Sequence, residues 1–348
     1  MYKKIFMSIA AVAALTLVSC SSDDLNSLSD NSSKDEAISF DGYWGRSAVS
    51  VNGSRGSVIN KAEDLQKVTE GFGVFGNYSS TDGTTPTYGE NWFKNQQVTY
   101  KTSAWTYTPV KYWLPKGHID FLAYAPYVEG TTLNGSSINF DVANKVAEQK
   151  DLLWANAANK TKENISSAGN KVKFQFAHAL SRLGYTVKLK DAYSDATITL
   201  NKITLAGSAT ESTKTAFYKN GTIDLSYTSS STTASLWNTS SSDKQNFTWF
   251  SGDQKLTDKV ANNTEYLFVI PQDFSVTATD KLYVIVEYTI QNNGVTEKMT
   301  NTVCKQLEKN FLQGKAYTIN LTIGLTPIEF DADVTPWADG DKEDITWN

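Results

Sequence analysis

The chain has 348 residues, a formal net charge of −5, and 12% aromatic residues. The acidic balance argues against a nucleic-acid partner, because a phosphate-binding surface needs clustered Lys and Arg side chains. The chain is longer than the segments that usually fold around a single small hydrophobic core, which predicts two domains.

The first twenty residues have the pattern of a lipoprotein signal. Lys3 and Lys4 precede a short apolar run over residues 5–18, and Cys20 follows it. The run is too short for a permanent membrane span, and this arrangement is typical of a secretory signal. We therefore predict a signal peptide over residues 1–20 and lipidation of Cys20, whose acyl chains would anchor the protein at about 0.8 kcal/mol per buried methylene. The alternative is an ordinary signal in which Cys20 has no special role.

The next forty residues predict a tether, a strand and a loop. Residues 21–36 are rich in Ser, Asp and Asn and bury too little apolar surface to fold, which predicts a flexible tether. Residues 37–44 predict the first strand, with Ile38 and Phe40 on one face. The Gly/Ser/Asn-rich stretch after it contains Arg46 and Arg55 and predicts an exposed, protease-accessible loop. A short helix is expected at 63–70.

The rest of the chain alternates apolar and polar residues, which predicts a mostly β fold built of antiparallel sandwiches. Expected strands lie at 71–78, 92–100, 105–112, 119–124, 172–176, 185–189, 196–205, 221–227, 265–270, 281–290 and 316–323. We place the N-terminal β-sandwich at 37–171 and the C-terminal β-sandwich at 172–348. The Ser/Thr-rich stretch 228–242 predicts a long surface loop.

Two cysteines occur, Cys20 and Cys304. If Cys20 carries lipid, Cys304 has no partner within the chain, so no disulfide is expected. Cys304 is then most simply a small buried apolar residue.

The sequence gives little support for catalysis, and no metal or other cofactor is expected. His118 and His178 are the only histidines, and without a nearby nucleophile motif each is predicted to be structural. The acidic residues Asp339, Asp341, Glu343 and Asp344 could supply oxygen ligands to calcium, but their spacing lacks the full loop pattern, which favours a solvated turn. Trp92, Trp105 and Trp113 are expected in the core, although exposed tryptophans can stack on sugar rings.

An ordered series of segments resembles the fimbrillin-like family of pilus subunits over nearly the whole chain. The segments are Gly71-Phe72-Gly73-Val74-Phe75, Trp105-Thr106-Tyr107, Lys111-Tyr112-Trp113-Leu114-Pro115, Phe121-Leu122-Ala123-Tyr124-Ala125-Pro126 and Phe176-Ala177-His178-Ala179-Leu180. They follow the lipoprotein signal, the acidic tether and an Arg in a Ser/Gly loop. Asp23-Asp24 after Cys20 also looks like the acidic signal that directs such lipoproteins to the outer surface.

The resemblance implies a non-enzymatic fimbrial subunit made of two transthyretin-like β-sandwich domains in tandem. It implies a lipid anchor in the outer membrane, an arginine-specific protease that cuts in the first loop, and assembly with other fimbrial subunits by strand exchange. On this chain, the strand at 37–44 would be removed by a cut after Arg55, which takes away the strand and loop 37–55, or else by a cut after Arg46. Ile38 and Phe40 would then be the plug of the groove that exchange fills. The alternative for both arginines is an ordinary surface charge.

The donor strand and the place in the filament stay open at this stage. The resemblance implies a C-terminal donor, for which Ile345 and Trp347 are the candidate residues. The tail is short for a strand of the usual five to six residues or so, so a tip or accessory role stays open beside a stalk role in supporting adhesion. The second functional hypothesis is a lipid-anchored surface glycan-binding protein that does not polymerise.

Overall fold

The computed structural model describes residues 37–44, 59, 62–81, 85–210, 213–228, 235–240, 242–263, 265–324, 329–336 and 343–345. Side chains are described for these residues except Trp44 and residues 329–336 and 343–345. Within these ranges the protein is mostly β, as the alternation predicts, with one short α-helix, α2 (Ala62–Lys67), and the 3-10 turns η2 (Val146–Glu148) and η3 (Ser166–Ala168). No helix in the described part of the chain has the length and apolar character needed to span a bilayer.

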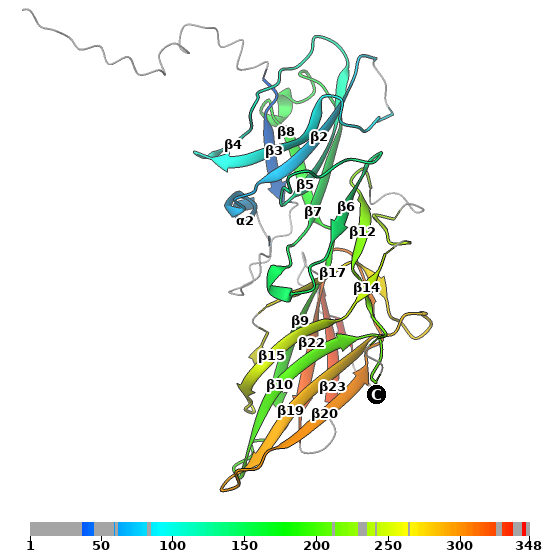
Figure 1. Ribbon diagram of the computed structural model, residues 1–348. Helices are drawn as coiled ribbons and strands as arrows, with labels where there is room; N and C mark the ends of the chain where they lie inside the picture. Colours follow the sequence, from blue (N-terminus) through cyan, green and yellow to red (C-terminus); the bar gives the residue numbers. More distant parts are fainter. Residues whose placement is uncertain are drawn as a thin grey trace, which may run out of the picture. The chain divides into compact units, whose positions relative to one another are not determined.

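The first sheet contains the earliest strands of the chain in the order β1-β8-β7-β5-β2-β3-β4. The strands are β1 (Phe40–Trp44), β2 (Phe72–Ser79), β3 (Phe93–Lys101), β4 (Ala104–Thr106), β5 (His118–Ala125), β7 (Leu153–Lys160) and β8 (Val172–His178) (Figure 1). All pairs in this sheet are antiparallel except β1 with β8, which is parallel. Strand β5 lies near the middle of the order and is buried along its whole length.

Two larger sheets contain most of the remaining strands (Figure 1). One has the order β15-β10-β19-β20, with β10 (Ala196–Ala206), β15 (Phe247–Lys255), β19 (Tyr283–Asn292) and β20 (Met299–Gln306). The other has the order β16-β9-β22-β23-β24, with β9 (Ser181–Leu189), β16 (Ala261–Asn262), β22 (Lys315–Ile323), β23 (Glu329–Pro336) and β24 (Glu343–Ile345), and β17 (Leu267–Val269) also pairs with β9. Apolar residues of both sheets enter one core.

A small sheet connects segments far apart in the sequence. Strand β6 (Ser137–Asp141) pairs with β12 (Asn220–Asp224), which in turn pairs with β13 (Trp237–Asn238). The remaining pairs are β11 (Phe217–Tyr218) with β14 (Lys244–Gln245) and β18 (Gln272–Asp273) with β21 (Asn310–Phe311). The Trp237 indole Nε1–H donates to the Ala179 carbonyl at 2.7 Å, which ties this small sheet to the segment between β8 and β9.

The structure corrects four expectations from the sequence. The strand expected over 105–112 ends at Thr106, because Pro109 has no N–H for a sheet ladder. The stretch 228–242, expected to be a surface loop, includes β13 and buried Trp237. Pairing is parallel for β1 with β8 and for β22 with β9, rather than antiparallel throughout. Cys304 is half-buried rather than buried.

The chain passes from the first sheet to the next after β8. Strand β8 pairs with β1 and β7, so it belongs with the strands that precede residue 171. The change from the first sheet to the next falls between His178 and Ser181. The division into two sandwich domains at 171/172 stays a prediction.

Candidate functional site

The candidate site is the slot occupied by β1 in the first sheet. Along its five residues β1 pairs, among the described strands, with β8 alone, in the parallel register Phe40↔Val172 to Trp44↔Phe176. The Val172 N–H donates to the Ser39 carbonyl at 2.8 Å and extends the ladder by one bond. Strand β1 is therefore an edge strand with a short ladder on one side.

The opposite side of the slot is formed by the segment that follows β4. The Ile38 N–H donates to the Lys111 carbonyl at 2.8 Å, and the Tyr107 hydroxyl donates to the Ile38 carbonyl at 2.7 Å. Burial raises the pKa of Tyr107 to about 12, so this hydroxyl stays protonated and able to donate at neutral pH. The start of the β1 segment is thus held on two sides.

The floor of the slot is aromatic. Ile38 and Phe40 are each 1% exposed. The Phe40 ring lies 5.3 to 5.6 Å, centroid to centroid, from four rings contributed by β3, β5, β8 and the segment after β4, namely Phe93, Phe121, Phe174 and Tyr107. Burying a phenylalanine side chain contributes roughly 1.5–3 kcal/mol, and well-oriented ring pairs add to that. Phe40 is the side chain that fixes β1 in the sheet.

The third inward position of β1 leaves little room for a side chain. A Cβ atom on Gly42 would lie 3.1 Å from Leu65 Cδ2 and 3.3 Å from Phe176 Cε2. Leu65 belongs to α2 and is fully buried, so α2 forms a wall of the slot. The slot therefore fits two large apolar side chains followed by glycine, in alternate positions of one strand.

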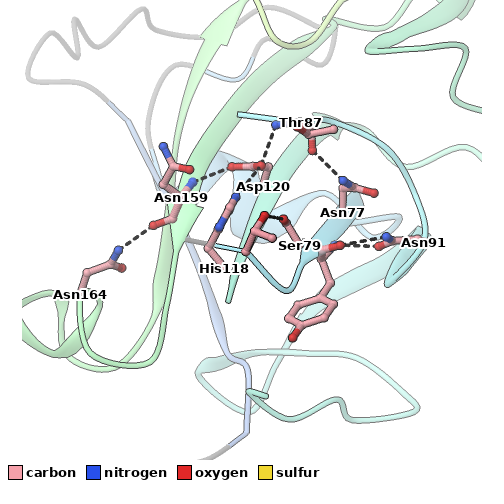
Figure 2. A network of polar contacts seen from close by, with 10 residues as sticks. Asn77, Ser79, Thr87, Asn91, His118, Asp120, Asn159 and Asn164 are labelled. Atoms are coloured by element: carbon pink, nitrogen blue, oxygen red, sulfur yellow. Dashed lines mark hydrogen bonds and ion pairs between the residues drawn. The ribbon is translucent and has the colours of Figure 1, made fainter. Parts of the chain in front are cut away.

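Both histidines of the chain lie beside buried carboxylates. Figure 2 shows the first pair, in which His118 Nε2 lies 3.4 Å from Asp120 Oδ2. The Asp120 carboxylate also accepts the Thr87 N–H at 2.8 Å and the Asn159 N–H at 2.7 Å. Because a buried carboxylate needs such donors, this network fixes the loop that contains Thr87 and the end of strand β7 to β5. It holds no nucleophile in the described contacts.

The second pair lies close to the slot. His178 Nδ1 lies 3.0 Å from the carboxylate of Asp151, which is 0% exposed. Asp151 Oδ2 also accepts the Ile59 N–H at 3.2 Å. Arg182, 7% exposed, stacks its guanidinium 4.5 Å from the Tyr266 ring centroid. Burial lowers the pKa of Arg182, and the Tyr266 hydroxyl and Asp151 oppose that change electrostatically.

The predicted site residues divide into those brought together and those outside the described residues. Ile38 and Phe40 lie side by side in the slot, as expected of one strand face. Cys20, Arg46, Arg55 and Trp347 lie outside the described residues, as do Asp339 and Asp341. Ile345 ends β24, where its backbone pairs with Ala332 of β23. Glu343 and Asp344 belong to the same strand.

Neither a metal cluster nor an exposed tryptophan occurs among the side chains that the structure describes. No group of three or more His, Cys, Asp or Glu residues there is arranged to hold an ion. The six described tryptophans are buried or half-buried: Trp92, Trp105, Trp113, Trp154, Trp237 and Trp249.

Sequence reasoning missed Tyr107, Leu65 and Asp151. Tyr107 contacts a residue 69 positions earlier, and Asp151 accepts a bond from a residue 92 positions earlier. Leu65 is one apolar residue in a short charged helix. No local pattern marks such long-range contacts, although the isolated Leu65 was a usable sign that α2 packs on something.

The architecture and slot define a β-rich protein whose first described strand is an edge strand inserted into an aromatic core, with no catalytic constellation among the described residues. The model of the fimbrillin-like family matches residues 61–337, and the chain belongs to that family. No curated protein matches the chain.

Three solved structures are similar to the chain at low sequence identity. A Bacteroides uniformis protein described as a candidate cell adhesion protein has a TM-score of 0.50 and 15% identity, over 86% of this chain and 99% of that one. A similarly described Bacteroides ovatus protein has a TM-score of 0.48 and 15% identity, over 90% and 99%. A fimbrial assembly protein of Parabacteroides distasonis has a TM-score of 0.39 and 10% identity, over 89% and 99%.

Family membership supports a fimbrial-type subunit at the cell surface that associates with other fimbrial subunits, and a non-enzymatic role.

Proposed function

We propose that this protein is a subunit of a surface fimbria that assembles by strand exchange, with β1 as the strand that leaves. The observation that carries the proposal is the combination of deep burial and weak pairing. Ile38 and Phe40 fill an aromatic slot, yet β1 pairs with β8 along one five-residue edge. A strand held in this way is removable as a unit.

Removal of β1 would leave a surface suited to binding another strand. The Phe93, Phe121 and Phe174 rings would lose the Phe40 ring that covers them, and β8 would present unpaired backbone groups. Exposed apolar surface beside an open sheet edge favours β-augmentation by an added strand. The cleaved subunit would therefore bind a strand from another subunit.

The C-terminal part of the chain carries a segment that matches β1. Residues 38–42 read Ile-Ser-Phe-Asp-Gly, and residues 328–332 read Ile-Glu-Phe-Asp-Ala. The two segments place Ile, Phe and a small residue at alternate positions, as the slot requires. We propose that the C-terminal segment of one subunit, with the predicted tail residues Ile345 and Trp347, fills the slot of the next. For residues 328–334 to take part, β23 must first leave its ladder with β22.

Export and processing complete the proposal. Cys20 would carry the lipid that holds the precursor at the outer membrane, and an arginine-specific protease would cut after Arg55, or after Arg46. Two transthyretin-like sandwiches in tandem would form the body of the subunit. The glycan-binding alternative has less support, because four of the six described tryptophans are buried and Trp92 and Trp113 are half-buried, whereas stacking on a sugar ring needs an open aromatic face.

The test treats purified precursor with an arginine-specific protease and follows it by mass spectrometry and gel electrophoresis. We expect loss of everything before Gly56, followed by ladders of subunits that persist in mild detergent. Arg55→Ala should abolish this cut and Arg46→Ala should leave it unchanged, whereas the reverse result would assign the cut to Arg46. A subunit that loses the β1 segment and stays monomeric at all concentrations contradicts strand exchange.

A further inference from the structure

The Asp151 carboxylate binds the backbone at the point where the described chain resumes after β1. Asp151 is 0% exposed and accepts the Ile59 N–H at 3.2 Å, while His178 Nδ1 lies 3.0 Å from the same carboxylate. Ile59 itself is 2% exposed and belongs to the core that contains Phe40 and Leu65. A buried carboxylate with these partners is costly to leave without them, so the bond to Ile59 is a firm attachment.

The two ends of the interval 45–58 lie at the same end of β8. Trp44, the last residue of β1, is in register with Phe176. His178 ends β8 two residues later and contacts the carboxylate that holds Ile59. A cut anywhere between Trp44 and Ile59 therefore separates two segments that are attached near the same end of β8. The segment before the cut is held by the β1–β8 ladder, and the segment after it is held by the bond from Ile59 to Asp151.

The attachment at Ile59 also bears on the wall of the slot. Helix α2 begins three residues after Ile59, and its Leu65 lies against the position of Gly42. If the chain from Ile59 onward detached, α2 would lose its N-terminal tether, and the slot would lose the wall that restricts its third position. An empty slot keeps its shape only if this segment stays in place.

We propose that Asp151 is a positioning residue for processing, which retains the chain from Ile59 onward when the preceding strand is cut away. This inference rests on the proposed function, because it assigns Asp151 a role in the exchange at the β1 slot. His178 orients the carboxylate toward Ile59. The retained α2 then keeps the vacated slot ready for a strand that ends in a small residue.

The test measures amide hydrogen exchange in full-length protein before and after treatment with an arginine-specific protease. In the wild type we expect the amides of residues 59–67 to keep their protection after the cut, within about twofold. In Asp151→Asn we expect them to exchange at least about tenfold faster, both before and after the cut, because a hydrogen bond to a charged group contributes more than one to a neutral group. Peptides from β10 and β19 serve as the internal reference for global unfolding.

Asp120→Asn is the matched control, because Asp120 is also 0% exposed, also lies beside a histidine and also accepts backbone N–H groups, from Thr87 and Asn159. It should leave exchange at 59–67 unchanged. His178→Gln removes one partner of Asp151 and should loosen the same residues, which keeps the test decisive if Asp151→Asn does not fold.

The inference is overturned if residues 59–67 keep wild-type protection in Asp151→Asn or in His178→Gln. It is also overturned if Asp120→Asn loosens these residues as much as Asp151→Asn does. Failure of the cut subunit to form ladders, with 59–67 still loosened selectively in Asp151→Asn, counts against the proposed function and leaves the attachment at Ile59 standing.

Discussion

Replacement of Phe40 by alanine should weaken the hold on β1 more than any other single change in that strand. The ring is 1% exposed and lies among four aromatic neighbours. Truncation of a buried phenylalanine to alanine costs about 3–5 kcal/mol, through lost transfer free energy and the cavity left behind. Since 1.36 kcal/mol corresponds to tenfold, the cut β1 segment should dissociate with a constant raised on the order of 10²- to 10⁴-fold.

The assay follows release of the β1 peptide from protein cut with an arginine-specific protease, by native mass spectrometry over a dilution series. Tyr43→Ala is the control, because Tyr43 lies on the same strand and is 39% exposed. It should change the dissociation constant by less than about threefold, as surface substitutions do. If the Phe40→Ala and Tyr43→Ala proteins release the peptide at the same concentration, Phe40 is not the residue that fixes β1 in the slot.

Three further predictions concern the surroundings of the slot and the connection between sheets. Burial raises the pKa of Tyr107 to about 12, so its neutral hydroxyl stabilises the fold fully below about pH 10, and this contribution is lost as the pH rises toward 12. In Tyr107→Phe the melting temperature should therefore fall less steeply between about pH 10 and 12 than in the wild type. An unchanged slope over that pH range would contradict the prediction. The hydrogen bond from Lys150 lowers the pKa of Glu70 to about 2, so its contribution is present above about pH 4.3 and lost as the pH falls toward 2. The pair is nearly half exposed, so Lys150→Ala should cost less than about 1 kcal/mol in urea denaturation at pH 7, and a larger loss would show tighter coupling than the geometry implies. Trp237→Phe leaves a buried carbonyl without its indole donor and should cost about 1–3 kcal/mol in the same assay, whereas a neutral result would mean that water replaces the bond.

The strands of the first sheet could be predicted well where alternation is strong. Strand β2 and strand β5 follow the apolar patterns of residues 71–78 and 119–124 closely. The burial of Ile38 and Phe40 follows from the same rule, because two apolar residues two positions apart face one side of a strand. The local sequence pattern is sufficient to predict these strands, because which side of the strand is buried determines where the apolar residues lie.

Partners and pairing direction could not be predicted, because they depend on contacts between distant residues. The residues Val172, Phe174 and Phe176 alternate in the same way whichever sheet β8 joins, so the local pattern does not indicate its partner strands. Trp237 lies in a stretch dominated by Ser and Thr, where one apolar residue carries little weight against the loop composition. Its burial comes from pairing with β12, which the local sequence does not encode.

The structure also explains why a cut, rather than the binding strength of β1 alone, would control exchange. While β1 is joined to Ile59 through residues 45–58, the slot meets it at an effective concentration of millimolar order, as short linkers provide. After a cut, the same strand is present only at its bulk concentration. A plug whose dissociation constant lies between these two values stays bound before cleavage and leaves after it.

The short parallel ladder and the single deeply buried ring of Phe40 are consistent with that intermediate strength, whereas a longer ladder would keep β1 in place after the cut. The retained attachment at Ile59 then confines the loss to the plug, so that the slot opens without loosening α2.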